Sequence, residues 1–525
     1  MTVWAGVDIG NATTEVVLCR GSGELEVIGS ARVPTRGGKG SLRAIDVAAQ
    51  LVRQVSGAHG LMVERAAFAP TPPVTSTTEQ VKLRTRRTGR LLIITRAAPT
   101  TAGDAAGIGV PVPVERLSEV GPDQSVIACA TADQGYRDVA GFVNAAIDSG
   151  RAVVGVVTTN DEAVLVSNRL RIPLPVIDGV DVTALLSATL VAVEVRQGFT
   201  SLQRLTDPHW LVDAFSLSDD ERADATVVAD QLFDSACAVV CLHDGTPEDD
   251  DQPAEPVPTA AETEASHVVH LADIAAQANS RRGAVVVDSL VRATMGDDVH
   301  RPPAGADALS EALGVPVVRV DSEAVAARVG ALTTPGVTED MAVVDVGGGT
   351  VDVVSATQRI VLPGAGQLLT TATSAALGIS RSTAEYAKRA EALSAVTPQL
   401  VEDEHGRRHF LDTPIDGRCT GWLLASAPNG LLPFTSRLSG SEWRNWRLAA
   451  KRLVIGANVV RGLERVAPDA RGLVLVGGGA GDDELVRAVS EQLGLRVTVG
   501  RGNVCRTLGH RYAVAYGLVA IAAGG

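Results

Sequence analysis

Two segments in opposite halves of the chain place an aspartate at the end of an apolar run, just before a glycine turn. Residues 8–13 read Asp-Ile-Gly-Asn-Ala-Thr, and residues 345–350 read Asp-Val-Gly-Gly-Gly-Thr. Glycine lets backbone N–H groups approach phosphate oxygens closely, and hydroxyl groups add further donors. An aspartate beside such a turn can hold Mg²⁺ and orient an attacking water. We therefore predict two phosphate-binding turns, with Asp8 and Asp345 as the carboxylates that organise the metal and the water.

The two segments belong to longer strings that repeat one another. VDIGNATTEVV aligns with VDVGGGTVDVV, and a third glycine turn follows an apolar run at 477–479. One Asp-Gly turn alone is weak evidence, but a duplication with a third turn is far more specific. The segment 38–41 lacks the spacing of a Walker A loop, and no G-x-G-x-x-G is present. The three turns together resemble the phosphate-1, phosphate-2 and adenosine pattern of the actin/Hsp70/sugar-kinase superfamily.

Apolar patterning predicts the elements that must position these turns. A period of two marks a strand, and a period of about 3.6 marks a helix. The predicted strands cover 3–9, 14–18, 341–346, 351–354 and 472–476, and the predicted helices cover 43–57, 446–466 and 512–523.

The middle of the chain has a different organisation. From 91 to 243, apolar strand runs alternate with helical stretches, which indicates a separate α/β domain. Within it, Cys237 and Cys241 are four positions apart in an apolar run, and we expect them on one face of a buried helix. The Pro-rich acidic tract that follows has too little apolar surface to fold, so we expect a linker or exposed loop.

Composition excludes several function classes. The chain has 525 residues, a net charge of −14 and 3% aromatic residues, which argues against a nucleic-acid or anionic-membrane binder. Its six cysteines form no C-x-x-C pair, and its beginning shows no secretory signal. We expect a soluble cytoplasmic protein.

A narrower resemblance covers nearly the whole chain. The strings at 8–16, 38–43, 165–178, 330–336, 362–366 and 500–504 are similar, in order, to the large subunit of diol/glycerol dehydratase-reactivating factors. The string LVSNRLRIPLPVID at 165–178 is distinctive, because Hsp70s, actins and sugar kinases lack it.

That resemblance implies an α/β fold: a duplicated ribonuclease-H-like (actin-like) ATPase domain with an inserted α/β swivelling domain. The implied boundaries are 1–90 and 330–525 for the two parts of the ATPase domain, 91–243 for the swivelling domain, 244–266 for the acidic linker, and 267–329 for an insert that returns to the ATPase domain.

The resemblance also implies site residues. The ATP or ADP contacts are Asn11, Ala12, Thr13, Gly347, Gly348, Gly349, Thr350, Gly478, Gly479 and Arg511. A second divalent cation, Mg²⁺ or Ca²⁺, would bind Thr101, Asp161 and Asp178 in the swivelling domain. Thr100 is nearly as good a match as Thr101, and Ala12 stands where the family has a hydroxyl residue.

The implied function is ATP-dependent and chaperone-like. Such a factor releases damaged cobalamin from an inactivated coenzyme B12-dependent diol or glycerol dehydratase, and its ATPase is slow and coupled to remodelling of the partner. The implied partners are a small subunit, in a heterotetramer of two large and two small subunits, and the dehydratase. Two alternatives remain open at this point: a sugar- or acetate-kinase-like phosphotransferase and an actin-like filament protein.

Overall fold

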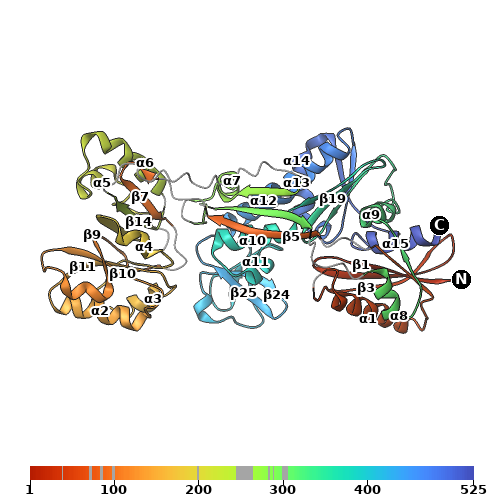
Figure 1. The fold of residues 1–525 in the computed structure, drawn as a ribbon, viewed down its shortest axis with the longest axis horizontal. Coiled ribbons are helices and arrows are strands. Elements are labelled where there is room, and N and C mark those ends of the chain that lie inside the picture. The colour runs from red at the N-terminus through yellow and green to blue at the C-terminus, as the bar shows by residue number, and fades with distance from the viewer. Residues whose placement is uncertain are drawn as a thin grey trace.

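The computed structural model is a mixed α/β structure with two bodies of unequal size. It describes residues 1–37, 39–69, 74–82, 87–96, 101–197, 200–233, 235–243, 264–281, 284–287, 289–297 and 305–524. Residues 91–243 form most of the smaller body, and both chain termini lie at the far end of the larger one (Figure 1). Among the described residues, no helix is both long enough and apolar enough to span a bilayer.

The N-terminal lobe of the larger body is built on a five-stranded sheet of order β17-β4-β1-β2-β3. Its elements are β1 (Val3–Ile9), β2 (Thr13–Arg20), β3 (Glu26–Pro34), β4 (Arg65–Phe68), β17 (Val317–Arg319), α1 (Leu42–Ala58), α8 (Ala306–Leu313), α9 (Glu323–Ala331) and α15 (Ala513–Gly524). Ala5, Val7 and Ile9 pack toward α1, whereas Trp4 packs toward α15, as the period of a strand requires. The strands predicted over 3–9 and 14–18 are confirmed and pair as a hairpin, and the helix predicted over 43–57 is confirmed as α1.

The second lobe repeats this topology with a sheet of order β20-β19-β18-β26-β27. Its elements are β18 (Ala342–Val346), β19 (Thr350–Val354), β20 (Arg359–Pro363), β26 (Gly472–Val476), β27 (Thr498–Arg501), α10 (Gly366–Leu377) and α14 (Asp483–Leu493). In each lobe, three antiparallel strands are followed by two strands that pair in parallel. The duplication predicted from the repeated strings is therefore a duplication of sheet topology.

The long helix predicted over 446–466 is present, and it begins earlier than expected. It runs as α12 (Gly440–Lys451), a π-helical segment (Arg452–Gly456) and α13 (Ala457–Val466). Ser439 and Glu442 form a capping box at its start. Arg447 and Lys451 on α12 are fully buried and form ion pairs with Glu404, Asp482 and Glu484.

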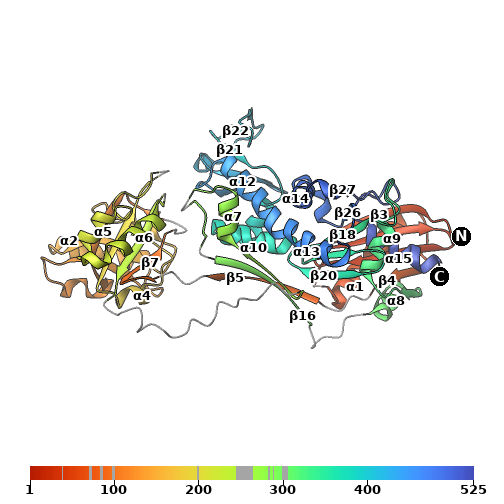
Figure 2. The ribbon, with the colours of Figure 1, turned by 90° about the horizontal axis from the view of Figure 1, so that it is seen from above.

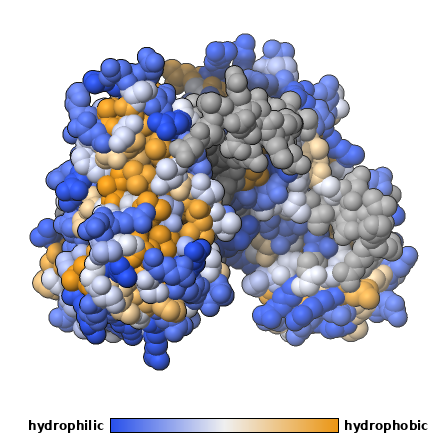
Figure 3. All heavy atoms as spheres, turned by 60° about the vertical axis from the view of Figure 1, so that its left-hand side comes forward, coloured by the Kyte–Doolittle hydropathy of each residue, from blue (hydrophilic) through white to orange (hydrophobic). Residues whose placement is uncertain are grey.

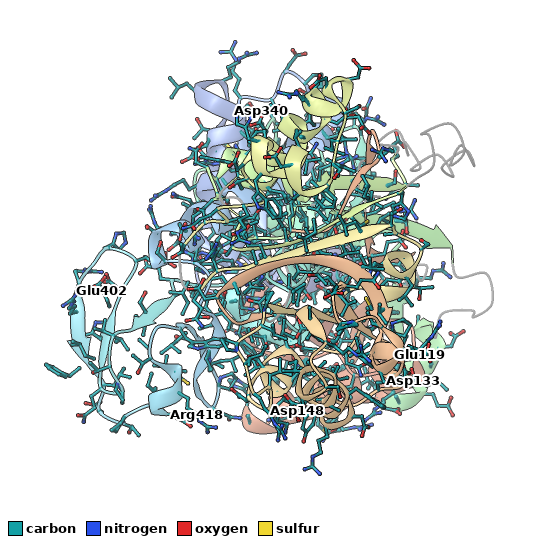
Figure 4. All side chains as sticks on the ribbon, turned by 90° about the vertical axis from the view of Figure 1, so that its left-hand side faces the viewer. Glu119, Asp133, Asp148, Asp340, Glu402 and Arg418 are labelled. Atoms are coloured by element: carbon teal, nitrogen blue, oxygen red, sulfur yellow. The ribbon has the colours of Figure 1, made fainter. Side chains whose placement is uncertain are left out.

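A small antiparallel sheet of order β23-β22-β21-β24-β25 projects from this lobe. Its strands are β21 (Leu393–Ala395), β22 (Leu400–Glu402), β23 (Arg408–Phe410), β24 (Leu423–Ala427) and β25 (Gly430–Thr435), and α11 (Arg381–Ala387) precedes them. Glu402 and Arg418 lie on this projection, to one side of the rest of the molecule (Figure 4).

The smaller body contains a nine-stranded sheet of order β6-β7-β14-β13-β9-β10-β11-β12-β8. Its elements are β6 (Arg87–Thr88), β7 (Leu91–Thr95), β8 (Thr101–Ala102), β9 (Ala105–Pro113), β10 (Ser125–Ala130), β11 (Ala152–Thr158), β12 (Val176–Ile177), β13 (Leu190–Val195), β14 (Cys237–Leu242), α2 (Tyr136–Asp148), α3 (Ala163–Ser167), α4 (Val182–Leu186), α5 (Pro208–Ala214) and α6 (Arg222–Leu232). The expectation that Cys237 and Cys241 lie on a helix is wrong, because both lie on strand β14. Residues four apart share a face in a strand as well as in a helix, and a fully buried strand shows no alternation that could distinguish the two.

A three-stranded sheet of order β15-β16-β5 packs against α10 of the larger body and extends toward the smaller one (Figure 2). Its strands are β5 (Val74–Lys82), β15 (Ser266–His270) and β16 (Ser289–Asp297), and α7 (Leu271–Gln277) follows β15. Strand β5 precedes the 91–243 region in sequence, and β15 follows it. Most of the predicted acidic linker, residues 244–263, lies outside the described residues, and Ser266, which we assigned to that linker, begins β15.

Helix α15 packs unusually close to its neighbours because three glycines lie at the contacts. A Cβ atom at Gly517 would overlap the carbonyl oxygen of Ala326 on α9. In the same way, a Cβ at Gly6 or Gly330 would overlap a backbone carbonyl oxygen of α15. The C-terminal helix is thereby fixed against both β1 and α9.

We expect Gly517→Ala to lower the free energy of unfolding by at least about 2 kcal/mol, because the new methyl group meets backbone rather than a movable side chain. Gly524→Ala on the same helix has no atom within 4 Å of the new Cβ and should change stability by less than about 0.5 kcal/mol. Urea unfolding of both variants measures the difference. Equal stability of the two variants would contradict the packing argument.

Candidate functional site

The two glycine turns face each other across a cavity of about 870 Å³ between the lobes. The turns are closed alike: Gly10 N–H donates to Thr13 O over 2.9 Å, and Gly347 N–H donates to Thr350 O over 3.0 Å. A Cβ atom at Gly348 would lie 3.3 Å from the Cβ of Ala12. The turns are therefore close enough for one small ligand to contact both.

Acidic residues converge where the two hairpins meet. Strand register places Glu15 opposite Asp8, and Asp352 opposite Asp345. A fifth carboxylate, Glu323 at the start of α9, accepts a hydrogen bond from Lys39 Nζ over 2.8 Å. All six side chains line the cavity.

This crowding shifts the titration of the cluster. Burial, followed by the charges of Asp352 and Glu323, raises the pKa of Asp345 to about 7. Burial also raises the pKa of Asp352 to about 6, and burial together with Glu323 and Glu15 raises the pKa of Asp8. Burial alone would lower the pKa of Lys39, but Glu323 and Asp8 outweigh it and the pKa is raised. Among these six side chains, one lysine opposes five carboxylates.

The third glycine turn forms another wall of the cavity. Gly477 has φ +80°, and a Cβ there would overlap Asp345 Oδ1, so a side chain is excluded on both grounds. The Arg511 guanidinium donates to Gly478 O over 3.3 Å. Asp482, which follows the turn, caps the N-terminus of α14 and pairs with Lys451 Nζ at 2.6 Å.

A basic residue and the start of α10 form the opposite side. Lys388 Nζ donates to Gly366 O and to Thr370 Oγ1, both over 2.6 Å. Burial lowers the pKa of Lys388, and Glu385, 2.7 Å away, opposes this shift. Gln367 N–H donates to Gly348 O over 2.7 Å, which fixes the second turn against α10.

Most of the predicted cavity residues lie together as expected. Those that line the cavity are Asp8, Asn11, Ala12, Thr13, Asp345, Gly347, Gly348, Thr350, Gly478, Gly479 and Arg511. Gly349 does not line it, and its carbonyl instead accepts from Gly364 N–H behind the turn, over 2.9 Å. The contact roles of these residues remain predictions.

Sequence reasoning missed several lining residues, above all Lys39, Glu323 and Lys388. Lys39 lies in the segment 38–41, which lacks Walker A spacing, and in the family-like string 38–43, and neither pattern indicates a partner for it. Glu15 and Asp352 were also missed, although the aligned strings place an acid at the same offset in both copies.

The predicted second metal site lies in the smaller body. Strand register places Thr101 opposite Ile177, the residue before Asp178. Asp178 is 1% exposed, and its Oδ2 accepts from Ala163 N–H over 2.9 Å, two residues beyond Asp161. The three residues thus belong to adjoining segments, whereas Thr100 lies outside the described residues. No described group of three or more His, Cys, Asp or Glu residues could hold a metal ion, so this set of two carboxylates and a hydroxyl remains a prediction.

Comparison with known proteins first defines the class. Two solved structures align over 100% of this chain and of their own, each at 24% identity: diol dehydratase-reactivating factor in its nucleotide-free form, with a TM-score of 0.62, and glycerol dehydratase reactivase, with a TM-score of 0.60. The fold is therefore the duplicated actin-like ATPase fold with an inserted swivelling domain.

Family models then define the particular family. Residues 260–522 match the diol dehydratase reactivase ATPase-like domain, and residues 92–250 match the DD-reactivating factor swiveling domain. The chain belongs to the diol dehydratase reactivase family. It is also 28% identical, over 98% of both chains, to the propanediol dehydratase-reactivating factor large subunits of Citrobacter freundii and Salmonella typhimurium.

The raised pKa of Asp345 leads to a pH-dependent prediction for the metal-free protein. Its pKa of about 7 in the folded protein exceeds the ordinary value of 3.8, so this group favours the folded state at low pH and loses that contribution as pH rises through 7. Asp345→Asn should therefore be more stable than wild type by about 1–3 kcal/mol at pH 8. The difference in free energy of unfolding between the variant and wild type should be about 1 kcal/mol smaller at pH 6 than at pH 8.

Denaturant unfolding in a chelating buffer at the two pH values measures this difference. Asp123→Asn, an exposed loop position, is the matched control and should track wild type at both. A difference that does not change with pH would contradict the assignment of the charge cost to Asp345.

Proposed function

We propose that this chain is the large subunit of an ATP-driven reactivating factor for a coenzyme B12-dependent diol or glycerol dehydratase. The observation that carries the proposal is the pair of equivalent glycine hairpins facing each other across an acid-lined cavity. The chain combines this cavity with a swivelling domain of the reactivase family. The related curated proteins are named as dehydratase-reactivating factor large subunits.

In this proposal, ATP binds with its phosphates between the two hairpins. Backbone N–H groups of the turns and the hydroxyls of Thr13 and Thr350 contact the phosphate oxygens. The turn at 477–479 and the side formed by Glu385 and Lys388 contact the nucleoside. Lys39 supplies the positive charge that opposes the phosphate charge.

The acid cluster suits the Mg²⁺ that accompanies ATP. Asp352 Oδ1 is buried with no hydrogen-bond partner among the described residues, and the charges that act on Asp352 include the carboxylate of Glu323 as well as Lys39. Carboxylates are the ligands Mg²⁺ prefers. Asp8, Asp345 and Asp352 would hold the ion through water molecules, since these carboxylates do not form a direct metal-binding group. The ion would neutralise the developing phosphate charge. Asp345 or Asp8 orients the attacking water, and slow hydrolysis follows.

In this proposal, ATP binding and hydrolysis switch the protein between two conformations. A ligand that binds two conformations with different affinity shifts their populations. The family resemblance suggests what is switched: affinity for the dehydratase, with displacement of a dehydratase subunit by the factor's own small subunit and release of the damaged cobalamin. A heterotetramer of two large and two small subunits in the cytoplasm, alone or in a microcompartment, completes the proposal. The two family-model matches favour it over a sugar or acetate kinase and over an actin-like filament protein.

Reactivation provides the decisive test. We expect the purified chain with its small subunit to restore activity to a glycerol-inactivated cognate dehydratase, given free adenosylcobalamin, ATP and Mg²⁺. Asp8→Ala and Asp345→Ala should each lower ATP turnover at least about tenfold, because each removes a group that organises transition-state charge. Recovery of dehydratase activity should fall together with ATP turnover in both variants.

Asp340→Ala, at an exposed position five residues before Asp345, is the matched control and should retain both activities. Recovery equal to a mixture without the factor would leave only an ATPase-like chain with no reactivating role.

The second metal site is tested in the smaller body. The double variant Asp161→Asn, Asp178→Asn should lose a bound divalent ion and weaken binding of the small subunit, because two of its three oxygen ligands lose their charge. The double variant Asp123→Asn, Asp138→Asn changes two exposed acids of the same body and should affect neither. Metal analysis and a binding titration measure the two effects. Unchanged metal content in the first variant would refute the site.

A further inference from the structure

Strands β5 and β15 connect the two bodies in sequence, and both contact elements that line the cavity. With β16 they form the three-stranded sheet that packs on the larger body and extends toward the smaller one (Figure 2). Their contacts with the larger body are specific hydrogen bonds rather than apolar packing alone, and they fall into two separate groups.

The first group joins the second glycine turn to β15 through Gly364. Gly349 O accepts from Gly364 N–H over 2.9 Å. Gly364 has φ +95°, and a Cβ there would lie 2.8 Å from His267 Cδ2. His267 is 2% exposed and lies on β15. The contacts from the turn through Gly364 to His267 are closely packed. A displacement of the turn would therefore also displace the His267 ring.

The same histidine also contacts the long helix. His267 Nε2 lies 3.0 Å from the carbonyl oxygen of Val454, within the π-helical segment Arg452–Gly456. The next residue, Ile455, lines the cavity. A π-helical segment frees carbonyl groups from the regular helical pattern and often marks a functional site. Further along, Arg461 donates to Ser266 O over 3.0 Å, so α13 also holds β15.

The second group joins the opposite side of the cavity to β5 through two adjacent threonines of α10. Thr370 Oγ1 accepts from Lys388 Nζ over 2.6 Å and donates to Glu385 Oε2 over 2.6 Å, and both partners line the cavity. Thr371 Oγ1 lies 2.9 Å from Thr78 Oγ1 on β5. One turn of α10 thus contacts the cavity and β5 at successive residues.

We propose that His267 and Thr78 are the residues through which occupation of the cavity is transmitted to the sheet β15-β16-β5, and from there to the 91–243 region. The inference rests on the proposed binding of ATP and adds the route of its effect. Two routes start at different sides of the cavity and end on the two strands that flank the swivelling domain. A ligand that draws the lobes together moves both starting points, and closely packed contacts of this kind shift as units.

Amide hydrogen exchange on the full chain, with and without saturating ATP and Mg²⁺, tests the proposal. In wild type, the nucleotide should slow exchange of residues 266–270 and 74–82 by roughly threefold or more. Thr78→Val should abolish this protection in 74–82 while the dissociation constant for ATP, measured by equilibrium dialysis, stays within about twofold of wild type. Thr77→Val is the matched control, since the Thr77 hydroxyl bonds to Thr294 on β16 instead of to α10, and it should keep the protection.

His267 is tested with two variants. His267→Leu removes the contact with Val454 O and should abolish protection of 266–270, whereas His267→Gln places an amide donor at a similar reach and should restore it. If His267→Leu does not fold, the Gln variant and the Thr78/Thr77 pair carry the test.

The outcomes separate this inference from the proposed function. Wild type that binds ATP without any protection of the two strands overturns the inference alone, and so does equal loss of protection in Thr77→Val and Thr78→Val. Wild type that binds no ATP overturns the proposed function and this inference with it.

Discussion

The close approach of two acid-bearing hairpins is the interaction on which the rest of the structure depends. Asp8 and Asp345 end the central strands of the two lobes, and each has another acid directly across the ladder. Like charges opposite one another destabilise a sheet, and burial adds to that cost. Such an arrangement persists only where the surroundings hold it in place, and it is typical of a site whose ligand brings the missing positive charge.

The surrounding residues hold the two acidic hairpins in place in two ways: glycines leave room for the carboxylates, and close packing fixes the backbone. A glycine at 477 leaves room for the Asp345 carboxylate, and glycines at 6, 330 and 517 let α15 pack directly against backbone. The apolar faces of the two sheets are covered by helices on both sides, so neither hairpin can move without disturbing a packed core. Free energy gained in those cores offsets the charge cost at the cavity.

Local signals in the sequence were sufficient for the hairpins, the duplication and most of the glycine contacts. Each depends on residues a few positions apart, and turn geometry constrains residue type there. Lys39 and Glu323 could not be paired in this way, because they are 284 positions apart and only the folded sheet brings α9 next to the first turn. Strand β14 was mistaken for a helix for a related reason, since complete burial erases periodicity. The swivelling-domain strand order likewise depends on long-range pairing that no local pattern encodes.

The helix from Gly440 to Val466 shows why buried charge in this protein serves geometry more than stability. Arg447 contacts Glu404 beside the small sheet and Glu484 at the start of α14, and Lys451 contacts Asp482 next to the third glycine turn. Replacing a buried ion network with apolar residues often leaves stability unchanged or improves it, so packing alone does not explain these charges. Hydrogen bonds to a guanidinium have fixed directions, however, and apolar contacts do not. With apolar residues at 447 and 451, the helix could keep its core contacts while α14 shifted along it. The glycine turn at 477–479, which precedes α14, would then lose its alignment with the two hairpins.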